Sequence, residues 1–597
     1  MSATFQVMEI DDQPLVVPTK RIRFSATKRY LVLLLVVLVL GAITLSIALP
    51  LCLTGTKKST SPSNEGQYAH AAVAADSALC STLGRRAMQE LGGNAVDAAV
   101  ATTLCLGVVH PQSSGIGGGG FLVIYNRSTG QAESFNFREA APTGAYEMML
   151  LDQNEKPGVV VGVPGEVKML EEIWQKYGQA DWKSLFDMAA EVADGFEVNS
   201  PLASAIASVK EKLDEDPRFS SLKDLVAPDG VYLREGDTMK RPLLAQTLRA
   251  IGASGSSDIF YKSDWTSTMV QEINELGGGF TYDDFALYET PSGSALQGEF
   301  MDMTVYGMKP PASGVVHQLM LNILSGYDMT ADDFGLLSYQ RTIETFKFAY
   351  GQRNKLGDPV FEPDVEDLVD VMMNPATANE MRAKIMDDAT FPPEYYEGNY
   401  SLPDEHGTTH FSVIDSDGNA VALTTTVNTY FGSKIHSPTL GLIYNDEMRD
   451  FSTPNTTDVW DLPPNPRNFV KPGKRPLSST CPSVLVDSNG DVAMAIGAAG
   501  GSRITPAVAL AVTKFYIFQK TLLESIDPPR PHHQLIPNVV FIENSFPDEY
   551  ADGLRDIGHQ VNLTSSGAVV QGIVRDPNTK ELTAVCDIRK DGEPDGF

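Results

Sequence analysis

The stretch HGTTHFSVIDSDGNAVALTTTVN, residues 406–428, predicts a β-hairpin with hydroxyl groups gathered on one face. Its turn, DSDGN at 415–419, consists of residues that favour tight turns. If the turn is centred on Asp417, antiparallel pairing places Thr408 opposite Thr426, with Cβ atoms about 4.5–5.5 Å apart. The apolar face is expected to cover a core and carries Phe411, Val413, Val421, Leu423 and Val427. The other face carries Thr408, His410, Ser412, Thr424, Thr426 and Asn428.

Two opposed hydroxyls suggest a catalytic nucleophile. A threonine hydroxyl is a weak nucleophile unless a base takes its proton. The α-amino group of an N-terminal threonine is one such base. Thr408 would gain it if the chain were cut between Gly407 and Thr408, and glycine tolerates the backbone strain that such a cut requires. On these residues alone, an ordinary threonine-rich strand remains the alternative, since threonine is common in strands. For His410 we expect a structural role.

The rest of the chain predicts a layered α/β sandwich. Residues 150–375 alternate helical stretches with turns, whereas strands dominate after residue 407 and a long helix is expected over 502–519. The glycine run GIGGGG at 115–120 matches a dinucleotide-binding pattern, but a strand follows it where that pattern requires a helix. It therefore predicts a close approach of two backbones.

Two helices are predicted over 69–93 and 94–109, with Asn94 as the N-cap of the second. They carry Cys80 and Cys105, for which we expect a disulfide; two buried thiols are the alternative. Cys481 and Cys586 have no clear partner, and a bridge between them stays open. The sequence contains no CxxC or HExxH motif, so we expect neither a metal site nor a cofactor.

A membrane anchor is predicted near the N-terminus. Residues 30–53 contain no charged residue and are long enough to span a bilayer. Basic residues concentrate before this segment, which places residues 1–29 in the cytosol, residues 54–66 in a stalk and the remainder outside the cell. Four glycosylation sequons fit an exported surface: Asn126, Asn399, Asn455 and Asn562. The net charge of −30 argues against binding to nucleic acid.

Several motifs identify the chain as similar to the γ-glutamyltransferases (γ-glutamyl transpeptidases), and in particular to animal, membrane-anchored members. Residues 408–452 resemble the start of that family's small subunit, and further matches are PLSST, GAAGGSRI, SSGIGGGGFLVIYN and FREAAP. The resemblance covers residues 67–597. It implies an N-terminal-nucleophile hydrolase fold, a four-layer αββα sandwich. It also implies a precursor that cleaves itself into a large subunit, 67–407, and a small subunit, 408–597, which remain together as a heterodimer in one catalytic domain.

The resemblance also assigns roles to residues. Thr408 matches the nucleophile and Thr426 its hydroxyl partner, while Gly500 and Gly501 match the glycines of the oxyanion hole. Contacts to the substrate's α-amino group are implied for Asn428, Glu447 and Asp450. Contacts to its α-carboxylate are implied for Arg138, Ser478 and Ser479, and Tyr430 matches an aromatic residue over the site.

We therefore expect a γ-glutamyltransferase, an acyltransferase with glutathione hydrolase activity. It would transfer the glutamyl group of glutathione or a related donor to water or to an amino acid or dipeptide acceptor. A self-processing amidase with another acyl preference is one alternative, and a catalytically silent surface binding protein is another. The charges of Arg138, Glu447 and Asp450 argue against the first, because only a zwitterionic acyl group needs both signs. The intact Thr408, Thr426 and glycine pair argue against the second.

Overall fold

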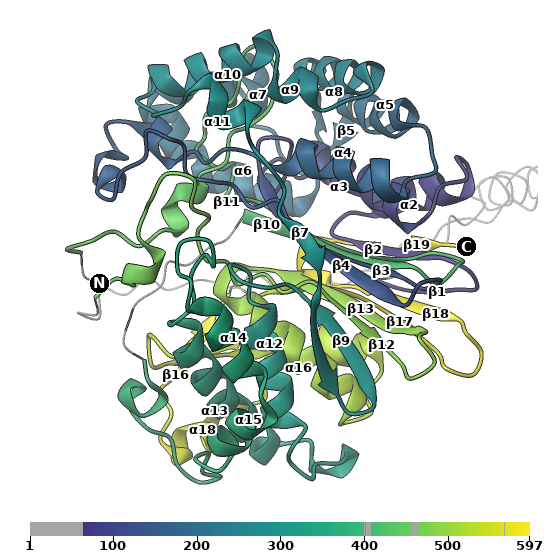
Figure 1. Cartoon of the computed structure of the whole chain (residues 1–597), viewed down its shortest axis with the longest axis vertical. Helices are drawn as coiled ribbons and strands as arrows, with labels where there is room; N and C mark the ends of the chain where they lie inside the picture. The colour runs from purple at the N-terminus through teal and green to yellow at the C-terminus, as the bar shows by residue number, and fades with distance from the viewer. Residues whose placement is uncertain (1–63, 399, 401–406, 457–462, 566) are drawn as a thin grey trace, which may run out of the picture. The chain divides into compact units, whose positions relative to one another are not determined.

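Two seven-stranded antiparallel sheets stack face to face in the computed structural model (Figure 1), which describes residues 64–597 apart from 399, 401–406, 457–462 and 566. The first sheet, in spatial order, consists of β1 (Glu65–Tyr68), β18 (Leu582–Cys586), β17 (Val569–Arg575), β13 (Val492–Ala499), β12 (Ser483–Val486), β9 (Met303–Gly307) and β8 (Leu296–Phe300). The second consists of β19 (Asp595–Gly596), β2 (Ala72–Ala75), β10 (Gly407–Ile414), β11 (Ala420–Asn428), β3 (Gly119–Asn126), β4 (Gln131–Asn136) and β7 (Ser292–Ser294).

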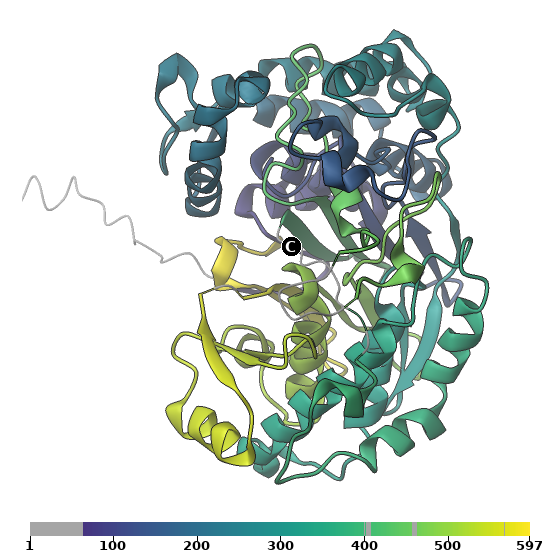
Figure 2. The same ribbon diagram turned by 90° about the vertical axis from the view of Figure 1, so that its left-hand side faces the viewer.

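Helices cover both outer faces of this pair of sheets, so the layer order is αββα as predicted. On the second sheet lie α2 (Ala78–Gln89) and α3 (Ala95–Val109). On the same side are α4 (Glu166–Tyr177), α5 (Trp182–Ala193), α6 (Ser200–Glu215), α7 (Ser220–Val226), α8 (Pro242–Ser254), α9 (Asp258–Tyr261), α10 (Asp264–Glu275) and α11 (Tyr282–Ala286). The first sheet is covered by α12 (Gly314–Leu324), α13 (Leu336–Arg353), α14 (Val365–Met373), α15 (Pro375–Arg382), α16 (Ile504–Tyr516) and α18 (Asp548–Ile557). Figure 2, turned by 90°, again shows helices on the two outer sides and the C-terminus between them.

The β10–β11 hairpin lies at the centre of the second sheet and has the predicted register. Thr408 pairs with Thr426, and the register shifts by a bulge between Gly407 and Thr408. Its apolar face belongs to the core under α3. The opposite face is also buried, because it meets the first sheet: a Cβ atom at Gly497 in β13 would lie 2.3 Å from the His410 ring. Every residue of the hairpin strands is therefore enclosed between two layers.

The prediction of a helix over residues 69–93 is wrong for the first part of that range. Ala72–Ala75 form strand β2, which pairs with β10 on one side and β19 on the other. Alanine-rich sequence favours helix, but these four residues are fully buried between β10 and β19, and this packing overrides the local preference. The second helix begins as predicted, since the Asn94 side chain accepts hydrogen bonds from the backbone of Val96 and Asp97.

Cys80 and Cys105 form the predicted disulfide between α2 and α3. Cys481 and Cys586 are buried free thiols, so the bridge left open between them is not present. Strand β1 begins at Glu65, inside the segment expected to be a stalk. The predicted anchor at 30–53 lies outside the described residues, and among the residues that the structure does describe, no helix is both long and apolar enough to cross a membrane.

Replacing both Cys80 and Cys105 with alanine should lower the free energy of unfolding by about 2–4 kcal/mol, because the bridge closes a loop with a sequence separation of 25 residues. Chemical denaturation of the purified protein, with and without reductant, measures the change. Cys481→Ala is the control, since it removes a buried thiol without opening a loop. Equal sensitivity of the wild type and the double variant to reductant would contradict the structural role of the bridge.

Candidate active site

Three hydrogen bonds converge on the hydroxyl of Thr426. Its Oγ1 lies 2.7 Å from the carbonyl oxygen of Gly407, 3.1 Å from Thr408 Oγ1 and 2.8 Å from the backbone nitrogen of Asn428. A hydroxyl has one proton to donate, and the Gly407 carbonyl can only accept it. Thr426 therefore accepts from the Thr408 hydroxyl and from the Asn428 N–H. This arrangement polarises the carbonyl of the Gly407–Thr408 peptide bond and orients the neighbouring hydroxyl.

The backbone of Thr408 is held from its other side by Lys590. The Lys590 ammonium donates to the Thr408 carbonyl at 2.6 Å and pairs with Asp76 at 2.8 Å. Asp76 also accepts from the Thr409 hydroxyl at 2.6 Å. Lys590 and Asp76 were missed in the sequence because they lie at opposite ends of the chain and belong to no local motif. Their contacts fix Thr408, the second residue of β10, which would become a chain terminus after cleavage.

Gly500 and Gly501 follow strand β13 and lead into α16. Their φ angles are +127° and +61°, a region that side chains rarely adopt, and a Cβ atom on Gly500 would lie 2.9 Å from Ala568 Cα. Backbone N–H groups at the start of a helix lack partners within it, so this turn can present them to negative charge. Thr408, Gly500, Tyr430 and Lys590 line one open cavity of about 1030 Å³. The predicted nucleophile and one of the predicted glycines thus face the same space.

The charged residues predicted to hold a ligand form a cluster of their own. Arg138, which follows β4, is fully buried, and its guanidinium pairs with both Glu447 and Asp450 of the short helix η7 (Glu447–Asp450). It also donates to the Leu477 carbonyl at 3.0 Å, immediately before Ser478. The sequence predicted that these charges would grip opposite ends of a ligand. In the structure they pair with one another.

The remaining predicted residues border this cluster. Asn428 adopts a φ of +76°, and its carboxamide donates to the Asp446 carbonyl at 3.1 Å, next to Glu447. Ser478 Oγ lies 3.2 Å from Thr480 Oγ1, and the Ser479 carbonyl accepts from Thr505 in the first turn of α16. The serine pair therefore lies between the arginine and the helix that follows the glycine turn.

The glycine run at 115–120 makes this assembly possible. A Cβ atom on Gly117 would lie 2.1 Å from the Ile443 carbonyl oxygen, and one on Gly118 would lie 2.1 Å from the Thr426 carbonyl oxygen. The backbone of Asn445 donates to Gly117 O at 3.1 Å. The expected close backbone approach is confirmed, and it brings η7 beside the end of β11.

Glu139 is a buried acid that the sequence analysis missed. Only 1% of its surface is exposed, and burial raises its pKa to about 8, although the Arg138 charge acts in the opposite direction. His410 is equally buried. Its Nδ1 lies 2.9 Å from Thr424 Oγ1 and its Nε2 lies 3.1 Å from Ser412 Oγ. Burial lowers the pKa of His410 to about 3, so it stays neutral, in keeping with the structural role expected for it.

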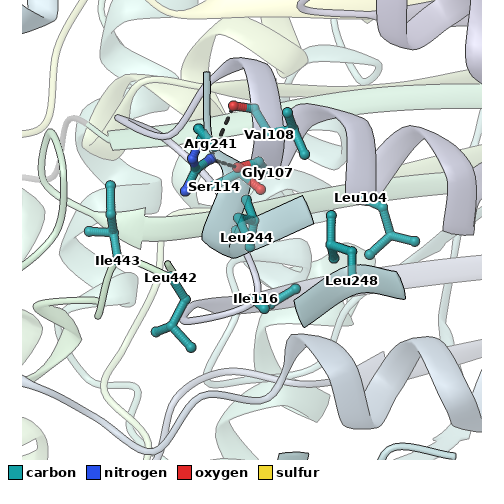
Figure 3. Close-up of a pocket in the computed structure, with 11 residues that line it drawn as sticks. Leu104, Gly107, Val108, Ser114, Ile116, Arg241, Leu244, Leu248, Leu442 and Ile443 are labelled. Carbon is teal, nitrogen blue, oxygen red and sulfur yellow. Dashed lines mark hydrogen bonds between the residues drawn. The ribbon is translucent and has the colours of Figure 1, made fainter. Parts of the chain in front are cut away.

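A second cavity, shown in Figure 3, lies beside Arg241 at the end of α3. The Arg241 guanidinium donates to the carbonyls of Gly107 and Val108, and burial lowers its pKa to about 9. The cavity measures about 10 Å³, room for roughly one water molecule. Its size excludes an amino-acid ligand, and the arginine instead stabilises the C-terminal carbonyls of the helix.

Comparisons with known proteins show what the whole chain is similar to. A family model described as gamma-glutamyltranspeptidase matches residues 80–597. Scoloptoxin SSD14 from Scolopendra dehaani is 38% identical over 552 residues, which cover 90% of this chain and 94% of that protein. Glutathione hydrolase 3 from Arabidopsis thaliana is 38% identical over 559 residues, 87% of each chain. The crystal structure of cephalosporin acylase from Bacillus halodurans has a TM-score of 0.77 over 91% of this chain and 98% of that one; at 24% identity it shows the fold alone.

Arg138→Met should destabilise the protein by about 3–5 kcal/mol, because it removes the guanidinium that pairs with the buried carboxylates of Glu447 and Asp450. In the folded variant these buried acids hold protons that the unfolded chain releases in this pH range. The loss of stability should therefore grow as the pH rises from 5 to 8. Thermal denaturation across this range measures it. Arg127→Met is the control, since it breaks a partly exposed pair with Asp491 whose contribution is about 0–1 kcal/mol. Equal, pH-independent losses in both variants would contradict the buried ion cluster.

Proposed function

The chain belongs to the gamma-glutamyltranspeptidase family, and we propose that it is a self-processing enzyme that cleaves the γ-glutamyl bond of glutathione and related γ-glutamyl compounds. The observation that carries this proposal is the hydrogen-bond arrangement around Thr426. It joins the carbonyl before the predicted cut to the hydroxyl after it. Relatives named glutathione hydrolase proenzyme, from Schizosaccharomyces pombe and Escherichia coli, support a precursor that is processed.

Maturation would begin when the Thr408 hydroxyl attacks the Gly407 carbonyl carbon. The hydrogen bond from Thr426 to that carbonyl oxygen stabilises the negative charge that develops there. The peptide C–N bond breaks, the Thr408 nitrogen takes up the proton that the hydroxyl has lost and leaves as a free amine, and an ester joins Gly407 to the hydroxyl oxygen. Water then hydrolyses the ester. This gives a large subunit that ends at Gly407 and a small subunit that begins at Thr408.

In turnover the same hydroxyl attacks the γ-carbonyl of the donor, and the new α-amino group of Thr408 takes its proton. The backbone amides of Gly500 and Gly501 stabilise the oxyanion. The leaving amine accepts the proton, and the glutamyl group remains on Thr408 as an ester. Water then yields glutamate, whereas an amino acid or dipeptide acceptor yields a new γ-glutamyl compound. These steps use groups of the chain itself.

The α-amino and α-carboxylate groups of the glutamyl moiety carry opposite charges, and the cluster around Arg138 contains both complementary signs. We infer that the substrate exchanges partners with the cluster. Its carboxylate takes the guanidinium together with the serine pair, and its ammonium takes Glu447 and Asp450, with Asn428 beside them. A ligand without these charges would leave the cluster paired with itself and gain no charged contact from it. A zwitterionic acyl group is therefore favoured over the substrates of a general amidase.

We also propose that the enzyme is anchored in the cell membrane as a single-pass protein through residues 30–53, with its catalytic part outside the cell. The uncharged segment and the basic residues before it support this orientation. A disulfide fits an oxidising compartment. Of the four sequons, Asn455 and Asn562 are exposed, Asn126 is partly buried, and Asn399 lies outside the described residues.

Thr408→Ala should give one uncut chain without activity, because the same hydroxyl serves both maturation and turnover. Thr408→Ser is the matched control: it keeps a hydroxyl and should still produce two chains with measurable activity. A denaturing gel reports the cut, N-terminal sequencing of the smaller wild-type chain should read Thr-Thr-His-Phe, and hydrolysis of a γ-glutamyl anilide reports turnover. Normal cutting of Thr408→Ala would refute Thr408 as the nucleophile.

A further inference from the structure

The residue that follows the glycine pair, Ser502, is held by two contacts that the mechanism above does not use. Its hydroxyl donates to Gln534 Oε1 at 2.6 Å. Its backbone carbonyl accepts from the hydroxyl of Tyr350. Ser502 and Tyr350 are both buried, so water competes little for these contacts. The side chain and the backbone of Ser502 are thus fixed from two directions.

The acceptor on Gln534 is itself held in place by His532. His532 Nε2 lies 2.9 Å from the same carboxamide oxygen, which can only accept, so this nitrogen carries the proton. His532 belongs to β14 (Pro531–His532), which pairs with β15 (Val540–Glu543) in a small separate sheet. The oxygen that receives the Ser502 hydroxyl is therefore tied to a second structural element.

Tyr350 approaches from α13, on the outer side of the first sheet. It belongs to the same hydrophobic cluster as Ala509 and Leu510 of α16, and this packing restricts the position of its hydroxyl. Under the proposed cleavage Tyr350 lies in the large subunit, whereas Ser502 lies in the small subunit. The contact between them therefore crosses the boundary between the two subunits.

The glycine turn, Gly500–Gly501, needs such support because its own residues restrain the backbone weakly. Both glycines have positive φ, and glycine samples more backbone conformations than any other residue. Across the turn, the Arg503 N–H donates to the Gly500 carbonyl at 3.2 Å. Stabilisation of an oxyanion requires donors that are held in one orientation before the reaction begins. Fixing Ser502 fixes the peptide group that joins it to the glycine turn.

We propose that Tyr350 and Gln534 are positioning residues for the oxyanion site: by holding Ser502 they keep the N–H groups of the glycine turn in the orientation that turnover requires. This inference rests on the proposed function. It makes the oxyanion site of the small subunit depend on a side chain of the large subunit.

The same inference separates turnover from self-cleavage. In self-cleavage the negative charge develops on the Gly407 carbonyl oxygen, which accepts from Thr426 and not from the glycine turn. Loss of the contacts to Ser502 should therefore slow turnover and leave the production of two chains intact.

Two variants each remove one contact. Tyr350→Phe deletes a single hydroxyl from a ring that stays packed, and Ser502→Ala deletes the donor to Gln534. The loss of a whole oxyanion donor lowers kcat about 100- to 1000-fold, so a misoriented donor should cost less, roughly 10- to 100-fold for a γ-glutamyl anilide. KM should change by less than about threefold, because the groups proposed to hold the substrate's charges are untouched.

Two further variants serve as controls. Ser502→Thr keeps the hydroxyl and should restore most of the kcat that Ser502→Ala loses. Tyr125→Phe removes a buried hydroxyl that donates to the Gly490 carbonyl at 2.9 Å, at the end of β3 away from Thr426, and should keep the wild-type kcat. A denaturing gel that shows two chains verifies maturation of every variant.

A boronic acid analogue of the γ-glutamyl group gives a second readout. The Thr408 hydroxyl adds to boron and passes its proton to the α-amino group, which yields a tetrahedral anion with an oxygen in the place of the oxyanion. The inhibition constant of this analogue should rise in proportion to the loss of kcat/KM. The inhibition constant of glutamate, which binds through its charged groups, should stay at the wild-type value.

Wild-type kcat and wild-type boronate affinity in both Tyr350→Phe and Ser502→Ala would overturn the proposal. So would equal losses of boronate and glutamate affinity, or a loss of self-cleavage as large as the loss of turnover. Either result would show that the contacts support the fold as a whole and not the glycine turn. A wild type that cuts itself and yet hydrolyses no γ-glutamyl donor would instead refute the proposed function, so the two failures are distinguishable.

Discussion

One hydroxyl group, that of Thr426, joins the two groups that the proposed self-cleavage requires, the Gly407 carbonyl and the Thr408 hydroxyl. It can donate only once, and its donation to the Gly407 carbonyl leaves it to accept from Thr408. This arrangement requires the two threonines to be directly opposed at the end of a rigid hairpin. The rigidity comes from burial on both faces, under α3 on one side and against the first sheet on the other. The sandwich thus serves to hold one pair of side chains in register.

The second constraint is electrostatic. A site for a zwitterion must contain both signs of charge, and in the absence of ligand those charges need partners inside the protein. Here Arg138 pairs with Glu447 and Asp450, so the charges have partners within the protein, and under the proposed function a zwitterionic substrate exchanges partners with them. The glycines at 117 and 118 make this possible, because only residues without side chains allow η7 to approach the hairpin so closely.

Local patterns predicted the parts of the structure that depend on local geometry. The DSDGN turn set the register that pairs Thr408 with Thr426, and Asn94 predicted the start of α3. Features set by distant packing were not predictable in this way. Ala72–Ala75 form a strand because of their neighbours in the sheet, and Lys590 reaches Asp76 only after folding. The charged residues were identified through family resemblance, but their mutual pairing is a property of the three-dimensional structure.

The central claim is that Thr408 carries the glutamyl group during turnover. It is tested most directly by incubating the processed protein with a γ-glutamyl donor in the absence of amine acceptors, quenching with acid and analysing its peptides by mass spectrometry. The peptide that begins at Thr408 should gain the mass of one glutamyl residue, in an ester that base removes. Hydrolysis of the donor with the label on another peptide, or with no labelled peptide at any time, would contradict the account.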